Sequence, residues 1–147
     1  MYLLDTNVLS ELRKGWRIDP TVKAFFAKLN ENDIYLAVQT LGEVQSGIQQ
    51  LRARNDQQQA QMLENWLYAI KEHYNDRILN FDTDCAQMWG SLMAGNSQNS
   101  IDKQIAAIAL IHDLTIITRN SRDFSRIGVK WVNPFLAGAA VQVGRAN

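Results

Sequence analysis

Four carboxylate side chains, far apart in the sequence, lie next to predicted strand ends and helix starts. Asp5 ends an apolar run at the N-terminus, and Glu43 lies in the first turns of a helix after the second predicted strand. Asp102 opens a helix of small apolar residues, and Asp123 follows the fourth predicted strand. Ligands of open α/β sheets bind beyond the carboxyl ends of the strands. We therefore expect the four acids to converge on one edge of a sheet.

Converging carboxylates repel one another and raise each other's pKa values unless a cation is present. A hard divalent cation such as Mg²⁺ suits them, because it takes oxygen ligands and keeps several of its waters. Such an ion lowers the pKa of its water and neutralises charge on a phosphoryl oxygen, and two ions would clamp both the attacking and the leaving oxygen. The sequence is compatible with a site for one ion and with a site for two. It predicts hydrolysis of a phosphodiester or of another phosphate ester.

The elements that must position these acids alternate between strand and helix. Apolar strands in such an alternation predict a parallel sheet that is covered on both faces. Two helices between the second and third strands, over about residues 40–75, form an extra helical pair. The sequence thus predicts an α/β fold with a central, mainly parallel sheet of about five strands. The expected strands are residues 1–5, 33–38, 77–81, 114–118 and 129–134.

Composition bounds the class of protein. A chain of 147 residues with 46% hydrophobic residues predicts one globular domain. Basic and acidic residues number 15 each, but six basic and two acidic residues fall between Lys103 and the C-terminus, which favours a local basic face. The single cysteine, Cys85, excludes an intrachain disulfide and suits a reducing cytoplasm. We see no signal peptide and no apolar run near the ~20 residues of a membrane-spanning helix.

Four motifs carry a resemblance to a known family. They are "LLDTNVLSEL", "LGEVQSGI", "DKQIAAIAL" and "LTIITRNSRDF", and in this order they resemble PIN domains. The likeness is greatest to VapC-type ribonuclease toxins of bacterial type II toxin–antitoxin pairs, including FitB-like proteins. The resemblance implies a PIN-like α/β/α sandwich over residues 1–135. A weakly patterned C-terminal tail that can be mobile follows over residues 136–147.

The resemblance also implies roles for individual residues. Asp5, Glu43, Asp102 and Asp123 would form the catalytic acidic site for Mg²⁺ or Mn²⁺. Asp5 and Asp102 are the leading metal ligands, with Glu43 and Asp123 acting through water. The supporting residues would be Thr6, Asn7, Thr118 and Asn120. Relatives often carry basic residues before the third acid, whereas this chain has "MAGNSQNSID" there. The candidates for RNA-phosphate contacts are therefore Lys103, Arg119 and Arg122.

The implied function is that of a cytoplasmic, Mg²⁺- or Mn²⁺-dependent endoribonuclease toxin. It would hydrolyse RNA phosphodiester bonds and arrest growth until neutralised by a small cognate antitoxin with a DNA-binding domain. The expected assembly is a homodimer or a dimer of toxin–antitoxin heterodimers, with the antitoxin on the extra helical pair.

Two alternatives stay open. The first is a PIN-like binding subunit that acts mainly in a toxin–antitoxin–promoter DNA complex. The second is another Mg²⁺-dependent phosphohydrolase, such as a haloacid-dehalogenase-like phosphatase. That chemistry needs a second acid two residues after Asp5, where this chain has Asn7.

Overall fold

The centre of the computed structural model, which describes residues 1–146, is a sheet of six strands in the order β3-β2-β1-β4-β5-β6. The five strands from β3 to β5 are parallel, and β6 is antiparallel to β5. This arrangement confirms the predicted mainly parallel α/β sheet and adds one strand to it. The strands are β1 (Tyr2–Leu4), β2 (Ile34–Ala37), β3 (Ile78–Leu79), β4 (Thr115–Ile117), β5 (Lys130–Val132) and β6 (Gln142–Val143).

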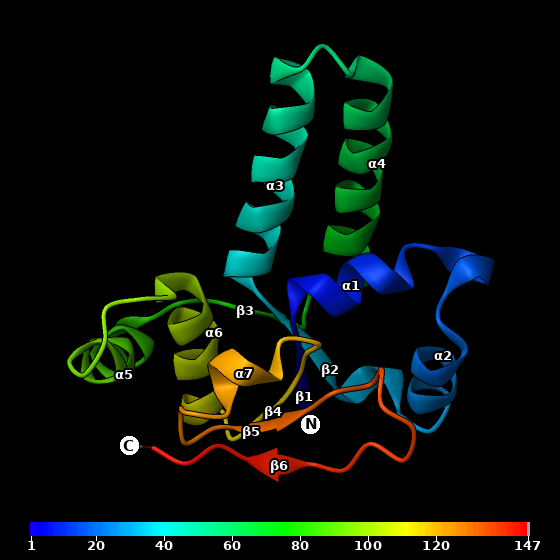
Figure 1. The fold of residues 1–147 in the computed structure, drawn as a ribbon. Helices are drawn as coiled ribbons and strands as arrows, with labels where there is room; N and C mark the ends of the chain where they lie inside the picture. The colour runs from blue at the N-terminus through cyan, green and yellow to red at the C-terminus, as the bar shows by residue number, and fades with distance from the viewer. Residues whose placement is uncertain (147) are drawn as a thin grey trace.

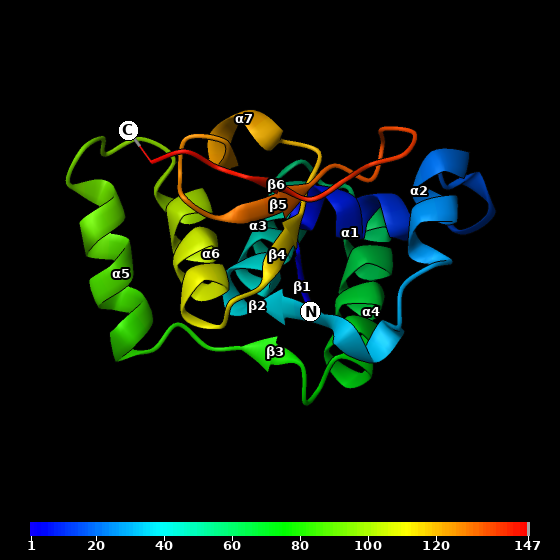
Figure 2. The ribbon, with the colours of Figure 1, turned by 90° about the horizontal axis from the view of Figure 1, so that it is seen from below.

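Helices cover both faces of the sheet, as Figure 2 shows with α5 and α6 on one side and α1, α2 and α4 on the other. The first side packs Ile105, Ile108 and Phe124 against Leu3 and Ile116 of the sheet. The second side has a separate apolar cluster on the opposite sheet face. The helices are α1 (Thr6–Leu12), α2 (Pro20–Phe26), α3 (Val38–Ala53), α4 (Gln57–His73), α5 (Thr83–Met93), α6 (Ser100–Ile111) and α7 (Ser121–Phe124). The buried residues of the second cluster are Leu4, Val8, Leu9, Ile34, Leu36, Tyr74, Ile117 and Val132.

Helices α3 and α4 form the predicted extra helical pair, which projects from the rest of the molecule in Figure 1. Buried side chains at helical spacing make its seam, with Val44 and Ile48 from α3 against Ala60 and Leu67 from α4. An ion pair of 2.5 Å between an arginine of α3 and a glutamate of α4 spans the pair at its surface. The pair therefore has a small apolar core of its own.

Helix starts follow the capping signals in the sequence. The Asp19 carboxylate accepts a hydrogen bond from the Thr21 backbone amide at 2.8 Å, and Pro20 occupies the first position of α2. Asp82 caps α5 in the same way through the Cys85 amide. Both caps satisfy amide groups that have no partner inside the helix. None of the helices in residues 1–146 is long and apolar enough to cross a membrane.

The C-terminal segment differs from the sequence expectation. Residues 136–147 are predicted as a weakly patterned tail, yet Gln142–Val143 within them form β6 and pair with Lys130 and Trp131 of β5. The strand has two residues and both side chains are exposed, so the sequence shows no alternation of apolar and polar residues that would predict it. The domain boundary at residue 135 stays a prediction, and Asn147 lies outside the described residues.

A close backbone approach holds this last strand in place. The Gly144 amide donates to the Val129 carbonyl oxygen at 2.9 Å. A Cβ atom at position 144 would lie 1.9 Å from the Ile127 carbonyl oxygen and 2.5 Å from that of Phe124. Only glycine fits at this contact without displacing the backbone.

We expect Gly144→Ala to lower the free energy of unfolding by about 1–3 kcal/mol, because the added methyl group forces the end of β6 away from β5. Urea denaturation of the purified variant measures the change. Gly90→Ala is the matched control, since a Cβ at this helical position meets nothing within 4 Å, and it should stabilise the protein by about 0.5–1 kcal/mol. Equal stability of the two variants would contradict the close approach.

Candidate active site

The four predicted acids lie at the carboxyl edge of the central strands. Asp5 directly follows β1, which pairs with β2 on one side and β4 on the other. Glu43 lies in the second turn of α3 after β2, Asp102 in the first turn of α6, and Asp123 in α7 after β4. The charges of the other three acids all reach Asp102 and raise its pKa. The structure thus brings together four residues of which the first and last are 118 positions apart in the sequence.

Asp5 is the most enclosed of the four, with a relative exposure of 5%. Its Oδ1 accepts the Thr6 backbone amide at 2.9 Å, and its Oδ2 accepts the Asn7 side-chain amide at 3.0 Å and the Thr118 hydroxyl at 2.7 Å. Burial raises the pKa of this carboxyl, although the three hydrogen bonds act in the opposite direction. Asp5 is therefore held in one orientation by residues of both α1 and the end of β4.

Thr6 connects Asp5 to the second acid. Its hydroxyl donates to Glu43 Oε1 at 2.8 Å and lies 3.1 Å from the hydroxyl of Thr40, which is fully buried. Desolvation beside α1 raises the pKa of Glu43, the Thr6 hydrogen bond lowers it, and the charge of Asp5 raises it further. The start of α1 thereby positions two carboxylates, one through its backbone and one through a side chain.

The convergence of the acids has a large effect on the pKa of Asp102. Desolvation raises its pKa to about 6, with further contributions from the charges of Asp5 and Asp123, from a hydrogen bond to Asp123 and from the charge of Glu43. None of the four acids forms an ion pair with a cation in residues 1–146. The four acids therefore gather negative charge that no ion pair within the described part of the protein neutralises.

Two asparagine amides orient Asp123. The Asn99 amide donates to Oδ1 at 3.0 Å, and the Asn120 amide donates to Oδ2. The Asn120 backbone amide donates in turn to the Thr118 hydroxyl at 3.0 Å, and this hydroxyl donates to Asp5. The segment after β4 therefore supports Asp5 and Asp123 through one continuous chain of hydrogen bonds.

All four predicted supporting residues make contacts at this edge. Asn7 does so twice, because its amide nitrogen donates to Asp5 and its Oδ1 accepts the Arg119 backbone amide at 3.2 Å. Two further residues, Thr40 and Asn99, are absent from the sequence expectation. Thr40 precedes Glu43 by three positions and so shares its helix face, which is a signal that the sequence contains. Asn99 adopts a left-handed conformation with φ of 54° before α6, and only the fold shows that it faces Asp123.

The three predicted phosphate-binding cations lie in different surroundings. Lys103 is buried at 8% exposure, and its ammonium group donates to the Asn96 carbonyl oxygen. Arg119 is exposed, and its guanidinium carbon lies 4.6 Å from the centre of the Phe135 ring. Arg122 is exposed on α7, beside Asp123.

The donor set of this edge is made of oxygen atoms. Within residues 1–146, no three side chains of His, Cys, Asp or Glu lie close enough together to enclose a metal ion directly. One or two carboxylates with several retained waters would suffice for a small hard cation. The carboxylate oxygens, which no ion pair of the described residues occupies, therefore fit such an ion only with water completing its shell.

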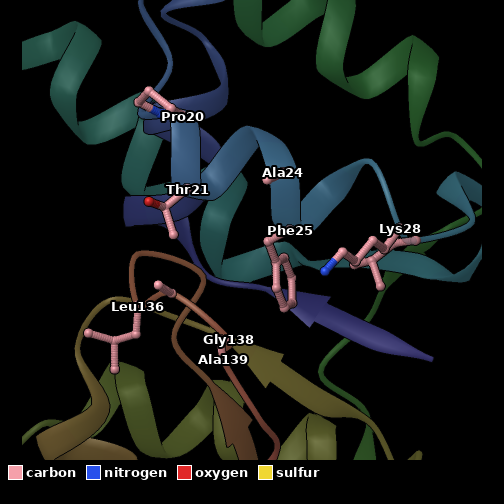
Figure 3. A pocket seen from close by; sticks show the side chains of 10 residues that line it. Pro20, Thr21, Ala24, Phe25, Lys28, Leu136, Gly138 and Ala139 are labelled. Carbon is pink, nitrogen blue, oxygen red and sulfur yellow. The ribbon is translucent and has the colours of Figure 1, made fainter.

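A hollow of about 460 Å³ lies away from the four acids and has a different character (Figure 3). It lies between α2 and the loop 136–139, and its walls are largely apolar, with Phe25 and Leu136 among them. Lys28 is its one charged residue, and no acid lines it in the described chain. This groove lacks the groups that acid–base or metal-assisted hydrolysis requires.

Asp102 generates a prediction that needs no substrate. Its pKa in the folded protein, about 6, lies above the ordinary 3.8, so the fold favours the protonated form. The stability that Asp102 contributes is present below about pH 4 and is lost as the pH rises through about 6. In the presence of EDTA, Asp102→Asn should therefore stabilise the protein at neutral pH by about 1–2 kcal/mol, after allowance for screening by water.

Thermal or urea unfolding of both proteins across this pH range measures the difference, which should shrink towards zero near pH 4. Asp76→Asn is the matched control, because the Asp76 side chain is 87% exposed. Its Oδ1 lies 3.9 Å from Arg77 Nε, so its charged partner is a cation and not another acid. A stabilisation by Asp102→Asn that does not depend on pH would contradict the mutual repulsion of the four acids.

Comparison with known proteins places the chain in a family. Residues 2–130 match the model of the PIN domain. The chain is 31% identical to Toxin FitB of Neisseria gonorrhoeae over 92% of its own length and 99% of that protein, and 30% identical to Plasmid stability protein StbB of Pseudomonas syringae pv. tomato over 93% and 100%. The crystal structure of FitAcB from Neisseria gonorrhoeae matches with a TM-score of 0.80 and 30% identity, over 92% of this chain and 99% of that one. The chain belongs to the PIN domain family, in its group of VapC-type and FitB-like toxins.

Proposed function

We propose that the protein is a metal-dependent endoribonuclease toxin that hydrolyses RNA phosphodiester bonds and arrests growth until a cognate antitoxin neutralises it. The observation that carries the proposal is the cluster of Asp5, Glu43, Asp102 and Asp123, whose charges act on Asp102 and of which none is in an ion pair within residues 1–146. A relative from Sinorhizobium fredii, 29% identical over 92% of this chain and 98% of that protein, carries the name VapC ribonuclease Y4jK, which supports the choice of RNA.

Mg²⁺ or Mn²⁺ would be held by Asp5 and Asp102, with Glu43 and Asp123 acting through water. When bound, such an ion neutralises charge on the phosphate and makes a water molecule more acidic. The protein's own residues do the positioning. Thr6, Asn7 and Thr118 hold the Asp5 carboxylate in place. Water attack at phosphorus in this arrangement leaves a 5′-phosphate and a 3′-hydroxyl.

Asn7 bears on the competing phosphatase hypothesis. A haloacid-dehalogenase-like mechanism uses the first acid as nucleophile and a second acid two residues later. In this protein the second position is an amide that donates a hydrogen bond to Asp5. That contact orients the Asp5 carboxylate but supplies no acid or base, and so it supports the nuclease proposal over the phosphatase.

The partner in this proposal is a small antitoxin with a DNA-binding domain. Structures similar to this chain include FitAB bound to an IR36 DNA fragment, with 28% identity and a TM-score of 0.70, and a toxin–antitoxin complex from Klebsiella pneumoniae, with 25% identity and a TM-score of 0.62. These two complexes support the proposal that an antitoxin binds this protein. The first of them also supports the proposal that the toxin–antitoxin complex binds promoter DNA. We place the protein in the cytoplasm, as a homodimer or as a dimer of toxin–antitoxin heterodimers.

Asp5→Asn should abolish RNA cleavage, because it removes the charge at the centre of the acid cluster while keeping a side chain of similar shape. The measurement is cleavage of cellular RNA by purified protein with Mg²⁺ or Mn²⁺, followed by mapping of the product ends. Asp76→Asn should cleave like the wild type, and EDTA should stop both active proteins. Cleavage by Asp5→Asn at the wild-type rate, or cleavage that persists in EDTA, would overturn the proposal.

The toxin role has its own test in cells. Expression of the wild-type chain should arrest growth, and expression of Asp5→Asn to the same level should not. Co-expression of the small DNA-binding protein encoded beside the gene should restore growth and should yield a stable complex on purification. Equal growth arrest by the wild type and Asp5→Asn would separate any toxicity from the acid cluster.

A further inference from the structure

Another hollow, of about 580 Å³, opens beside the acid cluster. Its walls come from the end of α5, the loop 94–99, the first turns of α6, α7, the turn that follows α7, and Ala146 near the C-terminus. Figure 2 shows α5, α6 and α7 at the same end of the molecule. Asp123 belongs both to the acid cluster and to the lining of this hollow. A ligand seated there would therefore lie next to the group being cleaved at the acids.

Three cations line the hollow, namely Lys103, Arg122 and Arg126, and we call it the basic hollow. Its only acid among the described residues is Asp123, whose two carboxylate oxygens already accept the Asn99 and Asn120 amides. None of the three cations forms an ion pair with an acid in residues 1–146. Positive charge thus faces the hollow without a partner in that part of the chain, next to a cluster that is negative.

One of the three cations, Lys103, is buried. The residue is only 8% exposed, and its ammonium group has the Asn96 carbonyl oxygen as its acceptor. A buried ammonium group is stabilised by an anion, which none of the described side chains provides. Lys103 also ties the loop 94–99 to α6 through this bond, so it shapes the wall of the basic hollow as well as its charge.

Three amide side chains form most of the remaining polar wall, to which Ser91 also belongs. Asn96, Gln98 and Asn99 line the basic hollow, and two of them have structural tasks: Asn96 Oδ1 accepts the Gln98 backbone amide at 2.8 Å, and Asn99 donates to Asp123. The Gln98 side chain is exposed and has no hydrogen-bond partner among residues 1–146. A side-chain amide offers both a donor and an acceptor, which is the chemistry that reads the edge of an unpaired base.

We propose that the basic hollow binds the nucleotide adjacent to the cleaved phosphodiester in single-stranded RNA. Lys103, Arg122 and Arg126 contact its phosphate, and Gln98 contacts the edge of its base. The volume is within the range of small-ligand pockets, which run from about 300 to 1,000 Å³. This inference rests on the proposed function, since it names how the substrate of that same site is held.

The arginines on this side of the molecule differ in their position relative to the basic hollow. Arg119 lies outside its lining, with the guanidinium group over the Phe135 ring. Arg126, which the sequence expectation omits, lies within the lining together with Arg122. Phosphate contact on this side of Asp123 is therefore assigned to Arg122 and Arg126.

The first experiment measures binding without cleavage. Fluorescein-labelled single-stranded RNA of about 12 nucleotides is titrated with the Asp5→Asn protein at several salt concentrations, and anisotropy gives Kd. Adding Arg122→Gln or Arg126→Gln should raise Kd roughly 3- to 10-fold and lower the slope of log Kd against log salt by about 0.7 for each arginine–phosphate interaction that the variant removes. Arg54→Gln, an exposed arginine just after the end of α3, is the matched control and should leave both quantities unchanged.

The second experiment addresses the base. Gln98→Ala should reduce the difference in Kd between oligomers of U, A and C while leaving the salt slope unchanged, because it removes an uncharged contact. Gln49→Ala on the exposed face of α3 is its control. A glutamate oligopeptide of equal charge should compete weakly, and competition equal to that of RNA would overturn the assignment to a nucleotide.

These outcomes are distinct from those that test the nuclease activity. Unchanged Kd and salt slope in both arginine variants would overturn the basic hollow even if the wild type cleaves RNA. Weaker binding by these variants supports it even if the wild type shows no cleavage, because the binding assay uses an inactive background. With active protein, Arg126→Gln should raise KM with little change in kcat, and the reverse split would contradict a binding role.

Discussion

The structure depends on one buried carboxylate, that of Asp5, at the end of the central strand β1. Burial of this group is unfavourable in its charged form, and three hydrogen bonds from Thr6, Asn7 and Thr118 reduce the cost. These donors belong to the start of α1 and the end of β4. The requirement to satisfy Asp5 therefore fixes how the first helix leaves the sheet and how the neighbouring strand ends.

The same constraint explains the rest of the acid cluster. Thr6 serves Asp5 through its backbone and Glu43 through its hydroxyl, so that α1 and α3 are held together at the site. Asp123 is oriented by two side-chain amides, and neither Asp123 nor Asp102 forms an ion pair within residues 1–146. Neutral donors orient the carboxylates and leave their negative charge available to a cation. A lysine or arginine in their place would orient the acids equally well but would cancel that charge.

Charge is separated over a short distance at this edge of the sheet. The acids gather around Asp5, while the basic hollow on the far side of Asp123 holds three cations without acidic partners in the described chain. A polyanion with a cation at one phosphate and basic side chains at the next would match this separation. The equal numbers of basic and acidic residues in the whole chain do not reveal this local separation.

Local patterns in the sequence determined the fold class, the helical pair and the edge of the sheet at which the acids lie. Strands β1, β2 and β4 are apolar runs, and Asp19 with Pro20 marks a helix start, so neighbouring residues suffice to predict them. Only the tertiary structure decided the places of β6, Asn99 and Lys103. Strand β6 exists through its pairing with β5, Asn99 acquires its role from Asp123, and Lys103 is buried by the loop whose carbonyl it binds. Each depends on a partner distant in sequence or on loop packing, and such contacts leave no periodic pattern in the chain.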